Sequence, residues 1–199
     1  EVMGRNGIIA TSQPLAAQAG LEIMRKGGNA VDAAVAAAAV LNLTEPMNVG
    51  MGGDLFAIIY TAKDRKLHVL NASGKAPSGE TIAFLNSKGY RVDPANWGPG
   101  SGMPLRGVLA ATVPGAAWGW QEVLDKYGTR TFKEVLEPAA TYAEQGVPLT
   151  ERAAFDWVLP DAIGPVPSDP ANCCTSVDPD SVRAWYIDGK QPKAGQIFR

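Results

Sequence analysis

Apolar residues recur at helical spacing near the start of the chain, at Leu15, Ala16, Ala19, Ile23 and Met24. Ser12 precedes this stretch and is a suitable N-cap, and Pro14 falls in the opening turn, where proline is tolerated. Gly27-Gly28 follows the stretch and is typical of a left-handed C-cap. The pattern therefore predicts a first amphipathic helix that ends at these glycines.

The next predicted helix is apolar on every side. Asn29 is a favourable N-cap, and Asp32 lies at the third helical position, near the positive end of the helix dipole. Capping accounts for Asp32 without a catalytic role. From Ala33 onward the residues are almost all apolar, until Glu45-Pro46 ends the helix. A helix of this kind is expected to be covered all round by other elements.

Two apolar runs then predict a β-hairpin. Residues 55–60 (LFAIIY) are typical of a buried strand, and residues 62–65 are a polar turn. Residues 66–71 (KLHVLN) alternate as a second strand would. A loop is expected from 71 to 79, and a short helix around 81–86.

The second half of the chain is expected to be mainly helical. Pro114-Gly115 opens one helix, which carries Trp118 and Trp120 on different faces, where packing explains them better than substrate stacking does. Thr131 and Glu134 form a capping box for the next helix. Pro138 is expected to break or restart that helix, because an interior proline costs about 3 kcal/mol.

The remaining segments complete a mixed fold. A further helix is expected near Thr150, and a short strand at residues 184–187. Residues 91–107 and 160–180 are rich in loop-forming residues and predict surface loops. Helices and strands are interleaved without regular βαβ alternation, so the pattern predicts an α+β fold.

Composition limits the classes of function. The chain has 199 residues, 46% hydrophobic and 19% charged, which is enough for one globular domain. Its formal net charge of −2, with scattered Lys and Arg, argues against nucleic acid or an anionic membrane surface as a partner. The longest apolar run, residues 33–41, is shorter than the about 20 residues of a bilayer span. No signal peptide is recognisable at Glu1, and the sequence is compatible with a periplasmic, secreted or cytoplasmic location.

Metal and cofactor sites are not expected. Cys173 and Cys174 are adjacent, a spacing that disfavours a disulfide between them, and His68 is the single histidine, so no Cys/His zinc site can be assembled. The glycines at 50–53 precede a strand instead of following one, and no phosphate-loop motif is present, which argues against a nucleotide cofactor. His68 has no Gly-x-Ser-x-Gly serine to serve in a triad.

Several motifs, in their order along the chain, resemble the gamma-glutamyltranspeptidase family of N-terminal-nucleophile (Ntn) hydrolases. The most specific is the run from Gly27 to Phe56, GGNAVDAAVAAAAVLNLTEPMNVGMGGDLF. The other matches are Ala10–Ala16 (ATSQPLA), Ala76-Pro77, Val113–Gly115, Trp118-Gly119, Tyr127-Gly128, Glu137–Ala139, Gly146 and Pro192–Phe198.

The resemblance implies an incomplete enzyme. Residues 1–199 are expected to be the N-terminal portion of a single Ntn-hydrolase domain, a segment of the large subunit, with the fold of a partial αββα sandwich. Such precursors cut themselves before a Thr, whose hydroxyl attacks an amide carbonyl while its α-amino group acts as base. The family writes that site as Thr, then Thr or Ser, then His, and no threonine here has that context. No catalytic residue is therefore expected on this chain, and the implied partner is the C-terminal remainder of the precursor, which carries the Thr.

Two departures from the family pattern bear on the substrate. Transpeptidases place an arginine four positions before the proline equivalent to Pro77, where it pairs with the α-carboxylate of the glutamyl group. This chain has Ser73, which cannot make that bidentate contact. The resemblance implies that Ser73, Gly74 and Lys75 line the pocket for a small amide or peptide substrate, and that Ser73→Arg improves the use of γ-glutamyl amides. The second departure is Asp54-Leu55, where transpeptidases continue the glycines.

Three functions remain open. The first is a self-processing amidohydrolase or acyltransferase that acts on γ-glutamyl or related amide bonds through an acyl-enzyme. The second is a glutathione-processing gamma-glutamyltranspeptidase proper, which needs the missing arginine to be replaced from elsewhere. The third is a non-catalytic binding module. Half of a sandwich should expose an apolar sheet face or edge, whereas an independent module should be monomeric and melt cooperatively.

Overall fold

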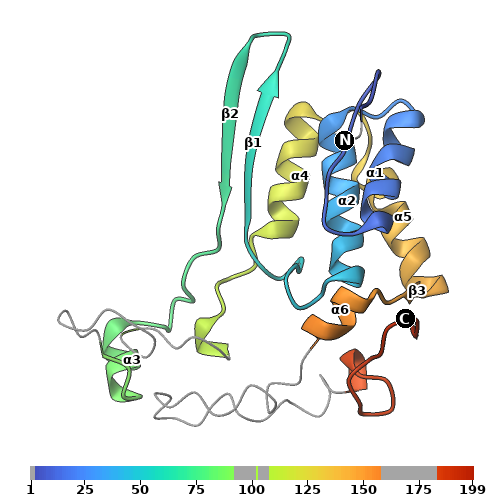
Figure 1. The fold of residues 1–199 in the computed structure, drawn as a ribbon. Helices are drawn as coiled ribbons and strands as arrows, with labels where there is room; N and C mark the ends of the chain where they lie inside the picture. Colours follow the sequence, from blue (N-terminus) through green and yellow to red (C-terminus); the bar gives the residue numbers. More distant parts are fainter. Residues whose placement is uncertain (1–2, 92–101, 103–107, 158–182) are drawn as a thin grey trace.

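Helices α1 (Pro14–Arg25), α2 (Ala30–Thr44), α4 (Ala116–Tyr127) and α5 (Phe132–Gln145) lie side by side, with a β-hairpin beyond α4 (Figure 1). The structure is a computed structural model that describes residues 3–91, 102, 108–157 and 183–199. All of these helices contribute to one core, which contains Ile23, Val35, Trp120, Leu124 and Val135. The helices and strands are mixed, as expected for an α+β fold.

The start of α1 differs from the prediction. Its N-cap is Gln13 and not Ser12, and Gln13 makes no side-chain cap hydrogen bond. The side chain of Gln13 is buried and donates from Nε2 to Oε1 of Glu45 at the end of α2 (2.9 Å). The predicted Ser12 cap is therefore wrong. The side chain of Gln13, the residue at the N-cap position, is hydrogen-bonded to Glu45 and does not cap the helix.

The end of α1 has the predicted left-handed cap. Gly27 has a φ of 90°, a conformation that glycine adopts without steric cost. The N–H of Gly27 donates to the carbonyl of Met24 (3.0 Å), and the N–H of Gly28 to that of Ile23 (2.9 Å). This pair of hydrogen bonds is a Schellman motif, which turns the chain directly into α2.

Helix α2 begins with the predicted cap but is not covered all round. Oδ1 of Asn29 accepts from the N–H of Val31 (2.8 Å) and of Asp32 (3.1 Å), and Oδ2 of Asp32 accepts from the N–H of Asn29 (2.7 Å). On one side, however, Ala34 is exposed and Ala38 is only half-buried. No element of the described part of the chain packs on that side, so these residues do not supply the complete cover that was expected.

The predicted hairpin consists of β1 (Leu55–Thr61) and β2 (Lys66–Ala72), paired antiparallel from Leu55↔Ala72 to Thr61↔Lys66. One face packs on the helical core through Leu55, Ala57, Ile59 and Leu70. The other face is exposed, so the expectation that residues 55–60 form a buried strand holds for one face only. Within the described residues this sheet has two strands.

Helix α5 continues through Pro138, and the predicted break is wrong. The helix is assigned without interruption from Phe132 to Gln145, and the predicted capping box of Thr131 and Glu134 is present at its start. Val135, one turn before the proline, is fully buried in the shared core. Packing of this kind offsets the local cost of the proline.

The smaller elements lie at the lower end of Figure 1. They are α3 (Ile82–Ser87), α6 (Glu151–Asp156), β3 (Val147–Pro148) and β4 (Ile197–Phe198), with a 3₁₀ turn at Val108–Ala110. The short helix after residue 81 and the helix after Thr150 agree with the prediction. The predicted strand at 184–187 is wrong: residues 184 and 185 are helical, and Ile187 forms only an isolated bridge to Lys190. Residues 160–180, most of 91–107, and both cysteines lie outside the described residues.

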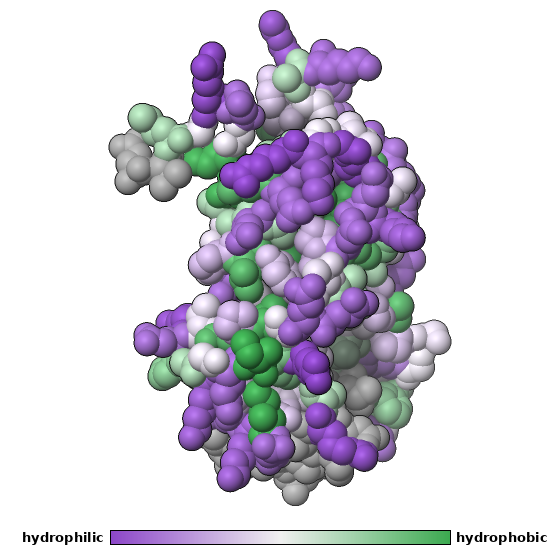
Figure 2. Space-filling view, turned by 90° about the vertical axis from the view of Figure 1, so that its right-hand side faces the viewer, coloured by the Kyte–Doolittle hydropathy of each residue, from purple (hydrophilic) through white to green (hydrophobic). Residues whose placement is uncertain are grey.

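The two sides of the helical layer differ in polarity. Figure 2 shows the side that carries α1 and α5, where hydrophilic residues predominate and hydrophobic ones form a narrow band. On the hairpin side of the layer, large apolar side chains of both strands face outward. The polar side is suited to solvent, whereas the hairpin side has the composition of a core.

Candidate functional site

Three loops meet at the carboxylate of Asp54, the residue before β1. Its Oδ1 accepts hydrogen bonds from the backbone N–H of Gly74 (2.8 Å) and from Oγ1 of Thr112 (2.9 Å). Its Oδ2 accepts from Oγ of Ser73 (3.2 Å). These hydrogen bonds join the end of the glycine-containing loop at residues 50–53 to the loop after β2 and to the segment before α4. We call this arrangement the Asp54 junction.

The junction is packed closely at the backbone level. A Cβ atom on Gly74 would lie 1.8 Å from the carbonyl oxygen of Val113, so only glycine fits there without movement of the backbone. A Cβ on Gly115 would lie 2.1 Å from the carbonyl oxygen of Ala72. The N–H of Val113 also donates to the carbonyl of Lys75 (2.9 Å). The conformation of residues 73–75 is thus fixed by neighbours that are distant in sequence.

Hydrogen bonding lowers the pKa of Asp54. The N–H of Gly74 is the largest cause, and the hydroxyls of Thr112 and Ser73 act in the same direction, while partial desolvation opposes them. Asp54 is exposed and is a carboxylate at neutral pH. It therefore places a negative charge at the surface of the junction.

The structure brings together part of the predicted substrate-binding set. Ser73 and Gly74 both donate to Asp54, whereas Lys75 contributes its backbone carbonyl and has an exposed side chain. In the sequence Asp54 is visible only as a departure from the family pattern. Thr112 carries no sequence signal, because its contact with Asp54 spans 58 residues.

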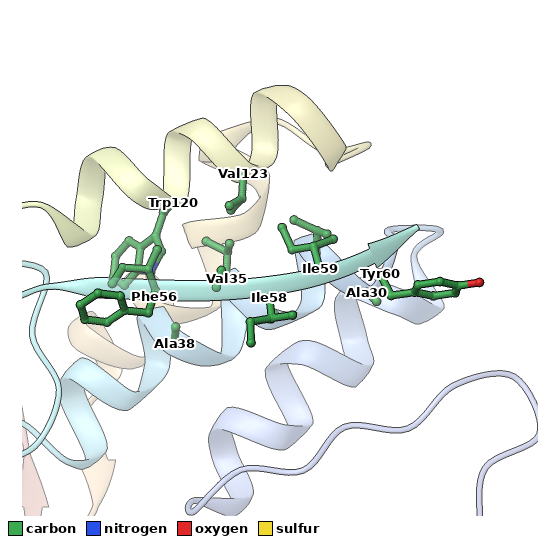
Figure 3. Close-up of a pocket in the computed structure, with 13 residues that line it drawn as sticks. Ala30, Val35, Ala38, Phe56, Ile58, Ile59, Tyr60, Trp120 and Val123 are labelled. Carbon is green, nitrogen blue, oxygen red and sulfur yellow. The ribbon is translucent and has the colours of Figure 1, made fainter. Parts of the chain in front are cut away.

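An apolar pocket of about 450 Å³ lies between α2, β1 and α4. It is lined by residues 55–60 of β1, by Trp120 and Val123 of α4, and by Ala30, Ala34 and Ala38 among others of α2. Figure 3 shows Ile59 on the side of β1 nearer α4, and Phe56 and Ile58 on the other side. Successive residues of a strand point to opposite faces of the sheet. Since all six residues from 55 to 60 line the pocket, the pocket runs along the edge of β1.

The outer face of the hairpin is apolar, and no other element of the described residues covers it. Its members are 61% to 75% exposed: Phe56, Ile58, Tyr60, Leu67 and Val69. Ile58 pairs with Val69 and Tyr60 with Leu67, so the side chains form a continuous surface across both strands. Continuous exposed apolar surfaces of this kind are typical of interaction sites. We call it the outer hairpin face.

His68 does not form a catalytic triad. Its Nε2 lies 3.2 Å from Oδ2 of Asp64 and 3.3 Å from Oγ1 of Thr61. A triad uses one ring nitrogen for the acid and the other for the nucleophile, so contacts through a single nitrogen cannot relay a proton between them. Instead, His68 packs against Tyr127, with ring centroids 5.0 Å apart.

Asp32 has the predicted capping role and a second structural one. It is completely buried, and it accepts from Oγ1 and the N–H of Thr129 (2.7 and 3.0 Å) and from the N–H of Arg130 (3.2 Å). Burial alone would raise the pKa of Asp32, but the hydrogen bonds from Thr129, Asn29 and Arg130 outweigh it and lower the pKa. Asp32 thus joins the start of α2 to the loop between α4 and α5.

Neither a metal site nor a membrane-spanning helix is present in the described residues. These residues contain no group of three or more His, Cys, Asp or Glu side chains that could hold a metal ion. In the same part of the chain, no helix is long and apolar enough to cross a bilayer.

Known sequences match most of the chain. The family model described as gamma-glutamyltranspeptidase matches residues 16–199. The glutathione hydrolase proenzyme of Bacillus subtilis (strain 168) is 39% identical over 162 residues, which cover 81% of this chain and 25% of that protein. The acylase ACY 1 proenzyme of Pseudomonas sp. (strain SE83) is 37% identical over 150 residues, 74% of this chain and 26% of that protein. The chain thus spans about a quarter of the length of these relatives.

Solved structures share the fold. Helicobacter pylori gamma-glutamyltranspeptidase superposes with a TM-score of 0.78 at 27% identity, covering 100% of this chain and 52% of that chain. Cephalosporin acylase from Bacillus halodurans superposes with a TM-score of 0.78 at 36% identity, covering 100% of this chain and 35% of that chain.

Proposed function

The chain belongs to the gamma-glutamyltranspeptidase family, and we propose that residues 1–199 are the N-terminal portion of a single Ntn-hydrolase domain. The remainder of that domain belongs to the same precursor. This is supported by the length of the relatives, because the part of each that matches this chain is only about a quarter of it. The complete protein is then a self-processing amidohydrolase or acyltransferase that acts on γ-glutamyl or related amide bonds.

The outer hairpin face is the observation that carries this proposal. Its five apolar side chains are mostly exposed, although the opposite face of the same hairpin packs on a well-formed core. Each such side chain gains about 1.5–3 kcal/mol on full burial, which is a strong drive for a second layer to cover them. In the proposed αββα sandwich, the second sheet is supplied by the remainder of the precursor.

The apolar pocket fits the same proposal. It runs along the free edge of β1 and over the uncovered alanines of α2. An open strand edge presents unpaired N–H and C=O groups, and a flanking surface of small side chains leaves room for a backbone. A further strand from the remainder would therefore extend the sheet at β1 and cover Ala34 and Ala38.

In the complete enzyme this chain supplies the scaffold and one wall of the substrate pocket. The Thr on the remainder attacks the amide carbonyl, a C–O bond forms as the C–N bond breaks, and the proton passes through the α-amino group to the leaving amine. Water or an acceptor amine then takes the acyl group and regenerates the hydroxyl. Ser73, Gly74 and Lys75, held by the Asp54 junction, contact the acyl chain.

Glutathione hydrolysis is a second candidate. It is favoured by the 39% identity to a glutathione hydrolase proenzyme. Against it stands Ser73, because a serine hydroxyl cannot replace an arginine opposite a carboxylate. We therefore propose amides other than glutathione as the main substrates.

Intact mass under denaturing conditions, with N-terminal sequencing of every chain, tests the proposed function. The protein isolated from its source is expected to contain a companion chain that begins with Thr, and amide substrates can then be screened on the complex. If this chain is found alone, folded and monomeric, it is not half of a catalytic sandwich. A search for a binding partner would then replace the search for a reaction.

A further inference from the structure

Asp54 places a fixed anion against the proposed substrate wall. Its Oδ2 lies 3.2 Å from the hydroxyl of Ser73, and in the described part of the chain its hydrogen-bond partners are all neutral donors. Because Asp54 is exposed, its charge acts on any ligand that reaches Ser73. Because Ser73 donates a hydrogen bond to Asp54, the two departures from the family pattern, at positions 54 and 73, are in direct contact.

This contact changes what Ser73 offers to a substrate. A hydroxyl has one hydrogen to donate, and Ser73 gives it to Asp54. A substrate carboxylate at this wall would meet the lone pairs of Ser73 with the Asp54 anion behind them. An ammonium or a neutral donor would instead find acceptors there.

We propose that Asp54 is a specificity-determining residue which, with Ser73, disfavours acyl groups that carry a carboxylate at this wall. The favoured substrates are amides whose acyl chain carries an ammonium or a neutral donor at that place. This inference rests on the proposed function, because it assigns a preference to the same pocket.

The proposal alters the effect expected for Ser73→Arg. A guanidinium at position 73 would lie beside Asp54 and form an ion pair with it, and would then be less available to a substrate carboxylate. Ser73→Arg alone should therefore give little gain with γ-glutamyl amides. The gain should emerge only when Asp54→Asn removes the charge, so the two substitutions are non-additive.

The test compares two p-nitroanilides with the complete, self-processed enzyme. γ-Glutamyl and 4-aminobutyryl p-nitroanilide differ only by the α-carboxylate. The wild-type enzyme should favour the 4-aminobutyryl amide, and Asp54→Asn should raise the γ-glutamyl to 4-aminobutyryl ratio of kcat/KM by about five- to tenfold, mainly through KM. Asn retains an oxygen acceptor for Gly74 and Thr112, so the junction is expected to persist.

Two control variants separate charge from structure. Thr112→Val removes one hydrogen bond to Asp54 but keeps the negative charge of Asp54. It should leave the γ-glutamyl to 4-aminobutyryl ratio of kcat/KM unchanged. Asp64→Asn removes an exposed carboxylate from the turn at the far end of the hairpin and should also leave the ratio unchanged. A shift in the ratio with Thr112→Val equal to that with Asp54→Asn would mean that loop structure, and not charge, sets the preference.

Binding of free glutamate and 4-aminobutyrate by calorimetry gives a second readout. Asp54→Asn should strengthen glutamate binding relative to 4-aminobutyrate. The inference is overturned if Asp54→Asn leaves both ratios within twofold, or if Ser73→Arg alone matches the double variant. Failure of the proposed function gives a different result, because no Thr-initiated chain would be found and no amide would be turned over. The inference would then be overturned together with the proposed function.

Discussion

At the residue scale, the buried carboxylate of Asp32 links the start of α2 to the loop between α4 and α5. It is fully buried and joins two separate segments, so its loss leaves several N–H groups without an acceptor. We expect Asp32→Ala to lower the free energy of unfolding of the complete protein by about 2–4 kcal/mol, measured by urea titration. Glu22→Gln, on the exposed side of α1, is the control and should change it by less than about 0.5 kcal/mol. A similar effect of both variants would contradict the role of Asp32.

The contribution of Asp32 also has a defined pH dependence. Its pKa in the folded state is lowered from the ordinary value of 3.8, so folding favours the charged form. The stabilisation is therefore complete above the ordinary value and is lost as the pH falls through the lower, folded-state pKa. The difference between the wild type and Asp32→Ala should shrink in the same range, and a constant difference down to pH 2 would contradict this.

At the element scale, Pro138 shows how packing offsets a local penalty. Pro138 has no N–H to donate to the carbonyl of Glu134, one turn earlier, yet α5 continues to Gln145. Pro138→Ala restores the donor, while the unfolded chain gains freedom that partly cancels the benefit. We expect a net stabilisation of about 1–2 kcal/mol by urea unfolding. The exposed neighbour Glu137→Ala should have almost no effect, and destabilisation by Pro138→Ala would show that the ring itself is needed for packing.

Elements that depend on local signals were predictable from the sequence, and those that depend on distant contacts were not. The caps at Asn29 and Thr131 and the turn at Gly27 follow from residues within one helical turn. The start of α1 at Gln13 depends on Glu45, which is 32 residues away. Local helix propensities contain no information on this contact or on the packing around Pro138.

The same division applies to the candidate site. The resemblance to a family pointed to the loop at Ser73, and the sequence marked Asp54 as unusual. That the two residues are hydrogen-bonded is a tertiary fact, since 19 positions separate them. The contribution of Thr112 is more remote still and has no sequence signature.

At the scale of the whole molecule, the outer hairpin face should decide between solubility and assembly. Ile58 is 75% exposed at its centre. In this chain made alone, Ile58→Lys should raise the soluble yield, because it interrupts the apolar surface. In the proposed precursor, the same change should bury a charge against the proposed second sheet and reduce the amount of Thr-initiated chain seen by mass spectrometry.

A matched control comes from another exposed isoleucine. Ile82 on α3 is 77% exposed and lies outside the hairpin. Ile82→Lys should leave processing of the precursor unchanged. Normal processing of Ile58→Lys would contradict the proposal that the outer hairpin face is covered in the complete enzyme.

The uncovered hairpin face also has a consequence for synthesis of the protein in the cell. A ribosome adds about 5–20 residues per second, so the several hundred residues that follow in a precursor as long as the relatives take on the order of tens of seconds to emerge. A hairpin forms within microseconds. In the proposed precursor, the outer hairpin face therefore stays exposed to water until the covering layer has been synthesised, for a time that depends on translation and not on folding. Nascent-chain chaperones should recognise this segment, and slower translation should lower the yield of assembled enzyme.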